Sequence, residues 1–175
     1  MPKILKHMTQ EGLSQEQMAM NGETLIHISN VSRYLTVVIQ NIMDRMNEHD
    51  ISKLSAEERD IFVEYTPKLA GVVYGSEEYK QFLEEMKPAL DNHYANNSHH
   101  PEHFENGISD MSLLDIIEML IDWKASSLRT KDGNIMRSLE IQKERFKIDD
   151  QLYQIMVNTA KELGFDESVN KESTN

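Results

Sequence analysis

Apolar side chains recur every three or four positions along most of the chain, which is typical of helices that bury one face. The longest such stretch covers residues 23–47, and its repeating positions are Leu25, Ile28, Val31, Leu35, Val38, Ile42 and Met46. Further periodic stretches cover residues 113–128, 135–146 and 149–163. The pattern therefore predicts an all-α fold, a single-domain helical bundle.

Capping and turn signals lie between the periodic stretches. Ser55 and Glu58 have the spacing of a capping box, in which the two side chains close the first turn of a helix. A further helix is expected to end near His93. Residues 96–107 contain Asn, Ser, Pro and Gly and are expected to form a loop before the next helix.

Composition limits what the chain can be. Its 175 residues suit one domain, with an N-terminal arm or short helix over 1–22, a helical domain over 23–165 and a frayed tail over 166–175. The absence of cysteine excludes disulfides and thiolate zinc sites. A net charge of -12 argues against binding to polymeric nucleic acid. The sequence shows neither a membrane span nor a secretory signal, so we expect a cytoplasmic protein without a membrane partner.

Histidine and carboxylate side chains gather at a few places along the chain. The histidines involved are His27, His49, His93, His99, His100 and His103, and Asp50 directly follows His49. Neutral imidazole and ionised carboxylate are ligands that first-row divalent metals prefer. Asp122 adds a carboxylate inside the apolar stretch 113–128, where an unpartnered charge would be costly. The pattern predicts a metal site made of His and Asp.

The expected positions of these ligands suit a helical bundle. Each lies at the end or edge of an expected helix, or in the loop between two, and a bundle can bring such side chains to one interior point. His49 and Asp50 are adjacent, so on a regular helix they would point about 100° apart. Both can reach one cluster if that cluster sits above a helix end.

One ordered set of these residues resembles a known motif. The set is His27, His49, Asp50 and Asp122. It is similar to the H…HD…D motif of the HD superfamily of metal-dependent phosphohydrolases, and the resemblance covers roughly residues 23–129. The resemblance implies an HD-like, all-helical domain for the central part of the chain.

The remaining histidines resemble one branch of that superfamily. His93 with the pair His99 and His100 looks like the expanded H…HD…H…HH…D pattern, whose members hold two or more metals and include the HD-GYP cyclic-dinucleotide phosphodiesterases. In this chain Pro101 is inserted between His100 and Glu102, and no Gly-Tyr-Pro follows Gly107. The resemblance therefore concerns the metal scaffold and not a specificity for cyclic-di-GMP.

The resemblance implies a division of the ligands between two ions. The ligands of the first ion would be His27, His49, Asp50 and Asp122. The second ion would be held by His93 and one or both of His99 and His100, with Asp50 bridging. The residues do not decide between His99 and His100, and His103 could bind metal, orient a ligand or contact substrate. Mn, Fe, Co, Ni and Zn all suit this mixed ligation.

The activity implied by the resemblance is the hydrolysis of a phosphoester of a small nucleotide by a metal-bound hydroxide. The substrate would be a nucleoside monophosphate or a cyclic or signalling nucleotide. Asp50 is the central candidate catalytic residue, and two cations could neutralise phosphate charge. Lys53 follows His49 by four residues, and Arg129 follows Asp122 by seven, on the same helix face.

Two hypotheses that assign the chain to other classes of protein stay open. In one, the chain is a non-catalytic protein that binds metal or sequesters a nucleotide. In the other, the histidines form a structural metal clip with a closed coordination shell. The oligomeric state is also open, because the apolar face of the C-terminal helix pair, residues 135–163, could serve a homodimer.

Overall fold

A computed structural model describes residues 12–72, 76–128 and 133–166 of the chain. Every regular element in these residues is helical, which confirms the predicted all-α class. None of the described helices is long and apolar enough to cross a membrane. The chain divides into two compact units, Met1–Asn47 and Glu48–Asn175, and each is described by itself.

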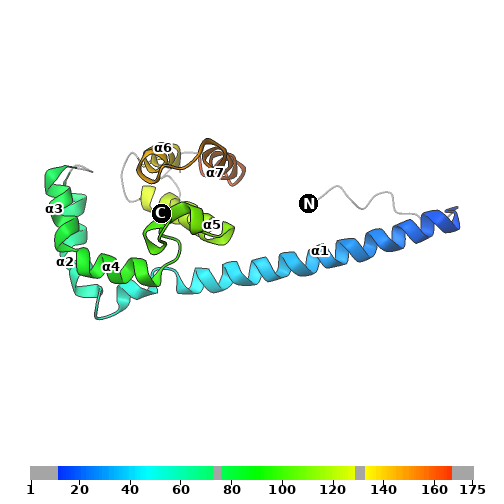
Figure 1. The fold of residues 1–175 in the computed structure, drawn as a ribbon, viewed down its shortest axis with the longest axis horizontal. Coiled ribbons are helices and arrows are strands. Elements are labelled where there is room, and N and C mark those ends of the chain that lie inside the picture. The colour runs from blue at the N-terminus through cyan, green and yellow to red at the C-terminus, as the bar shows by residue number, and fades with distance from the viewer. Residues whose placement is uncertain (1–11, 73–75, 129–132, 167–175) are drawn as a thin grey trace, which may run out of the picture. The chain divides into compact units, whose positions relative to one another are not determined.

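The described part of the first unit is almost entirely helix α1 (Gln15–Glu48), the long helix in Figure 1, whose last residue is the first of the second unit. The expected helix over 23–47 is present and begins earlier than its apolar repeat. The reason is a capping box: the Ser14 N–H donates to Gln17 Oε1 at 2.8 Å, and the Gln17 N–H donates to Ser14 Oγ at 3.2 Å. No residue of α1 is buried, so its apolar stripe is exposed.

The second unit contains six α-helices and three short 3₁₀ helices among the residues described. They are η1 (Ile51–Leu54), α2 (Arg59–Ala70), α3 (Glu77–Glu85), α4 (Lys87–Asn96), η2 (Pro101–His103), η3 (Gly107–Asp110), α5 (Leu113–Ser127), α6 (Ile135–Phe146) and α7 (Asp150–Glu162). The helix expected to end near His93 is divided in two, because the chain turns at Met86 just before Pro88. Proline suits the first turn of a helix, where its missing N–H has no intrahelical acceptor.

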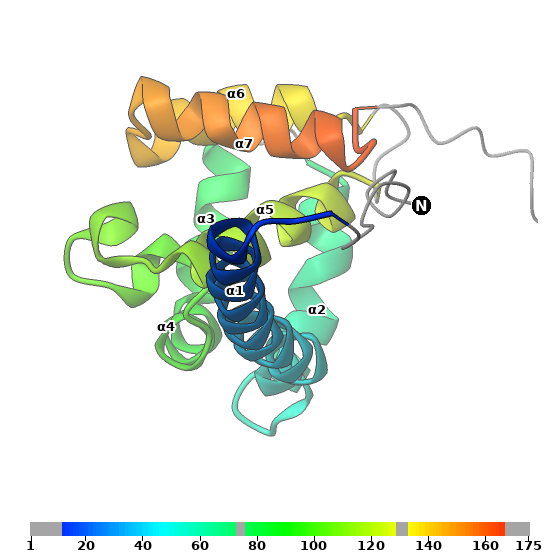
Figure 2. The same cartoon turned by 90° about the vertical axis from the view of Figure 1, so that its right-hand side faces the viewer.

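The apolar core of the second unit lies between α5, α6 and α7. Figure 2 shows α6 and α7 side by side, with α5 next to them. The buried core residues are Ile116, Met119, Leu120, Trp123, Ile135, Leu139, Ile148, Met156 and Ala160. The rings of Trp123 and Phe146 are stacked, with centroids 6.1 Å apart. This core fixes the position of α5, and α5 also carries several polar side chains of the candidate site.

The predicted capping box at Ser55 and Glu58 is wrong. Glu58 directly precedes α2, but its side chain makes no capping hydrogen bond and is instead fully buried. A capping box does occur at the start of α5, where the Ser112 and Asp115 side chains and backbone N–H groups bond reciprocally. Burial against a histidine is the competing interaction that takes the Glu58 carboxylate away from the helix terminus.

Candidate metal centre

His49 and Asp50 form the turn that follows α1. Asp50 has φ +58°, a left-handed backbone conformation that Asp adopts more readily than most residues with a side chain. This turn replaces the regular helical spacing of about 100° between neighbours. As a result the two adjacent side chains face each other, with His49 Nε2 3.6 Å from Asp50 Oδ2.

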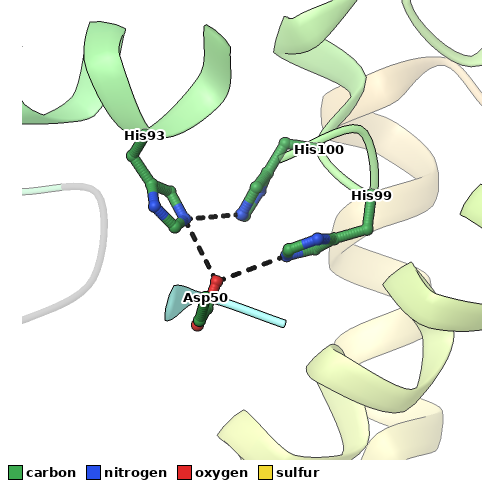
Figure 3. Close-up of side chains that lie close together, drawn as sticks. All are labelled: Asp50, His93, His99 and His100. Carbon is green, nitrogen blue, oxygen red and sulfur yellow. Dashed lines mark hydrogen bonds and ion pairs between the residues drawn. The ribbon is translucent and has the colours of Figure 1, made fainter. Parts of the chain in front are cut away.

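A first group of four side chains converges on one point, as Figure 3 shows. Asp50 Oδ1 lies 3.3 Å from His93 Nε2 and 3.5 Å from His99 Nε2. His93 Nε2 lies 3.0 Å from His100 Nε2. His93 comes from α4, whereas His99 and His100 come from the loop that follows α4. We call Asp50, His93, His99 and His100 the buried group, because His93 and His99 are only 2% exposed.

The loop that carries two of these histidines is tied to α5. Ser98 is the residue directly before His99, and its hydroxyl donates a hydrogen bond to Asp115 Oδ1 at 2.6 Å. The buried Asn97 amide donates to the His93 carbonyl at 2.7 Å and to Ser52 Oγ at 2.8 Å. These contacts connect α4, η1 and the loop, so the ligand-bearing segments are held together by polar contacts.

The polar atoms of the buried group fit a divalent cation. Among the described residues, Asp50 Oδ1 and His99 Nε2 are buried without a hydrogen-bond partner, although buried polar groups are nearly always bonded. The two nitrogens of His93 and His100 face each other, and their lone pairs would repel unless a proton or a metal ion lay between them. Burial, with His99 and His93 nearby, lowers the pKa of His100 to about 3, so this ring is neutral and ready to bind metal at neutral pH.

A second group uses the other oxygen of Asp50. His49 Nε2 lies 3.6 Å from Asp50 Oδ2 and 3.8 Å from Asp122 Oδ1. The side chains of His49, Asp50 and Asp122 are 31%, 18% and 17% exposed, so we call them the open group. Asp50 therefore belongs to both groups, with Oδ1 facing one and Oδ2 facing the other, which is the arrangement that a bridging carboxylate needs.

The charges of the open group are strongly coupled. The carboxylates of Asp122 and Glu118 raise the pKa of His49 to about 10, against the opposing effect of burial. Burial alone would raise the pKa of Asp50, but the His93 ring and the Lys53 ammonium outweigh it and hold this pKa well below its usual range. Without metal, a proton on His49 thus balances the acidic side chains around it.

Two carboxylates lie behind the histidine rings. Glu58 Oε2 is 3.0 Å from His93 Nδ1, and Glu118 Oε1 is 2.9 Å from His49 Nδ1 and 3.1 Å from His99 Nδ1. A carboxylate that accepts from Nδ1–H leaves Nε2 free to bind metal. Sequence reasoning missed both. Glu118 precedes the predicted Asp122 by four residues on one helix, and that spacing could have revealed it.

The other candidate residues lie in different surroundings. Lys53 Nζ is 2.5 Å from Asp50 Oδ2, beside the open group. His103 is exposed, and its Nδ1 lies 2.7 Å from the Tyr94 carbonyl oxygen, away from both groups. His27 lies within α1 in the first unit and belongs to neither group. Arg129 lies outside the described residues.

The fold and the cluster define the class of protein: an all-α protein whose buried His, Asp and Glu side chains could hold a metal ion. The chain belongs to a family of unknown function (DUF5662), whose sequence profile matches residues 16–164. No curated protein and no solved structure matches the chain. The matched region includes every residue of both groups and ends before the C-terminal tail.

Proposed function

We propose that this protein is a metal-dependent phosphohydrolase of the HD type that acts on a small nucleotide. The observation that carries the proposal is Asp50, whose two carboxylate oxygens face two sets of side chains that could ligate metal. All the histidines and aspartates of the motif from position 49 onward take part in these sets. The HD-like order of the residues along the chain supports the same reaction class.

The chemistry follows from what the two groups could do. Divalent ions bound there would act as Lewis acids and lower the pKa of a bound water toward neutrality, as phosphoester hydrolysis requires. The buried group offers three imidazoles and one carboxylate, with His93 and His99 almost inaccessible to solvent. The open group is more accessible and is the side from which a substrate could approach.

The charge of the chain supports this substrate class. A protein with net charge -12 repels an anionic ligand at long range, so a phosphorylated substrate needs local positive charge. Lys53, 30% exposed beside Asp50, can supply one such charge. A small phosphoester such as a nucleoside monophosphate or a cyclic nucleotide therefore suits the site better than a polymeric nucleic acid.

The direct test is a substrate screen of the purified full-length chain. Nucleoside monophosphates, cyclic nucleotides and cyclic dinucleotides would each be incubated with Mn²⁺, Fe²⁺, Co²⁺, Ni²⁺ or Zn²⁺, and phosphate release and chromatography would be followed. We expect turnover of at least one compound, a loss of at least about 10³-fold in Asp50→Ala, and an unchanged rate in the control Asp91→Ala. Asp91 is an exposed residue of α4 that pairs with Lys87.

Two results would contradict the proposal. An Asp50→Ala protein as active as the wild type would separate the activity from the metal centre. Saturable nucleotide binding with the nucleotide recovered intact after long incubation with Mn²⁺ would instead indicate the non-catalytic, sequestering alternative.

A further inference from the structure

We infer that Glu118 is a shared positioning residue, one carboxylate that orients a histidine in each of the two candidate metal groups. It acts on His99 in the buried group and on His49 in the open group. The inference rests on the metal-binding part of the proposed function and not on hydrolysis. It assigns Glu118 an effect on two metal positions at once.

The geometry places both imidazole rings between two carboxylates. On one side, Glu118 Oε1 lies 2.9 Å from His49 Nδ1 and 3.1 Å from His99 Nδ1. On the other side, His49 Nε2 and His99 Nε2 lie 3.6 Å and 3.5 Å from the two oxygens of Asp50. The rings are close neighbours, with centroids 4.5 Å apart and planes inclined by 37°. A single oxygen of Glu118 therefore determines which nitrogen of each ring points toward Asp50.

The proton positions follow from this arrangement. Glu118 Oε1 is placed to accept a hydrogen bond from Nδ1–H of both rings, which is how a carboxylate orients a histidine. A ring held in this way binds metal through Nε2, after the ion has displaced any proton that Nε2 carries. The alternative, in which Glu118 itself binds an ion together with the two Nδ1 atoms, leaves the buried His99 Nε2 without a partner. The orienting role is therefore the better reading of the contacts.

Glu58 provides a natural contrast. Its Oε2 lies 3.0 Å from His93 Nδ1, and its Oε1 accepts from the Asn92 amide at 2.8 Å. Among the candidate ligands it faces only His93, a member of the buried group alone. Glu58 and Glu118 have the same chemistry, but one reaches a single group and the other reaches both. Loss of either should therefore produce different patterns of metal binding.

The first experiment measures metal affinity without substrate. Zn²⁺ binding to the wild-type chain, Glu118→Gln and Glu58→Gln would be followed by calorimetry and equilibrium dialysis, with circular dichroism of the metal-free proteins to verify folding. We expect two ions in the wild type. Loss of an orienting carboxylate typically weakens metal binding about 10–100-fold. Glu118→Gln should weaken both steps by this factor, whereas Glu58→Gln should weaken only one.

The second experiment uses the wild-type chain alone, so it decides the question even if the variants do not fold. Ring ¹⁵N chemical shifts and long-range couplings to ring protons in the Zn²⁺-loaded protein report which nitrogen of each histidine carries the proton. We expect Nδ1–H and Nε2-bound metal for both His49 and His99. The inverse tautomer in either ring overturns the inference.

The metal titration has further outcomes against the inference. A wild-type chain that binds one ion, or a Glu118→Gln variant that weakens only one of two steps, would show that Glu118 is not shared. Neither experiment measures phosphate release. A chain that binds two ions as described and hydrolyses nothing would therefore contradict the proposed function and leave the role of Glu118 intact.

Discussion

Helix α5 has two faces with opposite properties. One face carries the buried apolar residues Ile116, Met119, Leu120 and Trp123, which pack against α6 and α7. The other carries the carboxylates of Asp115, Glu118 and Asp122, spaced three and four residues apart. The apolar face is complete within the fold, because its side chains fill a core. The acidic face borders a cluster in which Asp50 Oδ1 and His99 Nε2 have no hydrogen-bond partner among the described residues.

This difference separates two kinds of stabilisation. Apolar burial is largely independent of pH and of divalent ions, since it depends on the area removed from water. A buried cluster of His, Asp and Glu is conditional, because unpaired polar groups cost free energy until a proton or a cation satisfies them. If the two kinds of stabilisation are independent, the two faces of α5 can be changed separately.

The largest effect on folding is expected on the apolar face. Leu120→Ala removes a side chain that is 3% exposed, and such truncations typically lower the free energy of unfolding by about 2–5 kcal/mol. The loss should be equal in EDTA and in Zn²⁺, and Zn²⁺ affinity should change by less than about threefold. Urea denaturation in both conditions measures it. A loss seen only with Zn²⁺ would mean that the two faces are not independent.

The next effect is metal dependence on the acidic face. An ion that binds only the folded chain raises the free energy of unfolding by about 2.7 kcal/mol at one hundred times its Kd. Saturating Zn²⁺ should therefore raise the melting temperature of the wild type, and EDTA should reverse the shift. His99→Ala should lose most of the shift, because His99 Nε2 belongs to the buried group. An equal shift in wild type and variant would place the bound ion elsewhere.

Metal binding by the open group should depend on pH. The pKa of His49 is raised to about 10 by Asp122 and Glu118, so an ion must displace a proton from this ring at neutral pH. Displacement of one proton strengthens binding about tenfold per pH unit between roughly pH 7 and 9. Calorimetry in buffers of different ionisation enthalpy should detect about one released proton for this ion.

For the metal-free chain, the raised pKa of His49 has the opposite consequence: the free energy of unfolding falls as the pH rises. The stabilisation from protonated His49 is fully present below the pKa of about 6.5 that histidine has when unfolded. It is lost as the pH rises through the folded value of about 10. Metal-free stability should fall in the same pH range in which metal affinity rises. Parallel trends of the two quantities would contradict the role assigned to His49.

The smallest effect is expected at Lys53, whose ammonium is 2.5 Å from Asp50 Oδ2. Lys53→Met should strengthen metal binding by the open group a few-fold, because an ion pair of this kind is worth about 0–1 kcal/mol and competes for the same oxygen. If the proposed hydrolysis holds, KM for the nucleotide should rise in the same variant. Lys53→Arg keeps the charge and should preserve KM. Unchanged metal affinity and KM in Lys53→Met would leave Lys53 without a role.

Periodicity was sufficient for much of the fold. The helix expected over 113–128 is observed as Leu113–Ser127, and the stretch 135–146 matches Ile135–Phe146. Each has a clear signal because a helix that packs on a core must repeat its apolar residues every three or four positions. The predicted capping box at Ser55 and Glu58 was wrong because, in the folded chain, the Glu58 carboxylate contacts His93 instead of the backbone at the start of the helix.

The candidate site was predictable in part. His49, Asp50, His93 and Asp122 were singled out from their order along the chain, and the fold brings them near one another. The choice between His99 and His100 was open from the sequence, and the fold brings both into the buried group. Glu58 had no such signal, and Glu118 had only its four-residue spacing from Asp122. Carboxylates are common on helix surfaces, so it is their contacts in the folded chain that distinguish these two.

By itself, the sequence determined the helical class, the helices of the core and the residue types available to a metal, because apolar periodicity and ligand chemistry are properties of local sequence. Only the tertiary structure decided which nitrogen of each histidine faces which carboxylate. That outcome depends on the left-handed backbone at Asp50, on the Ser98 contact to α5 and on the packing that orients Glu118. The Ser98 and Glu118 contacts join segments far apart in the chain, and no local pattern specifies such contacts.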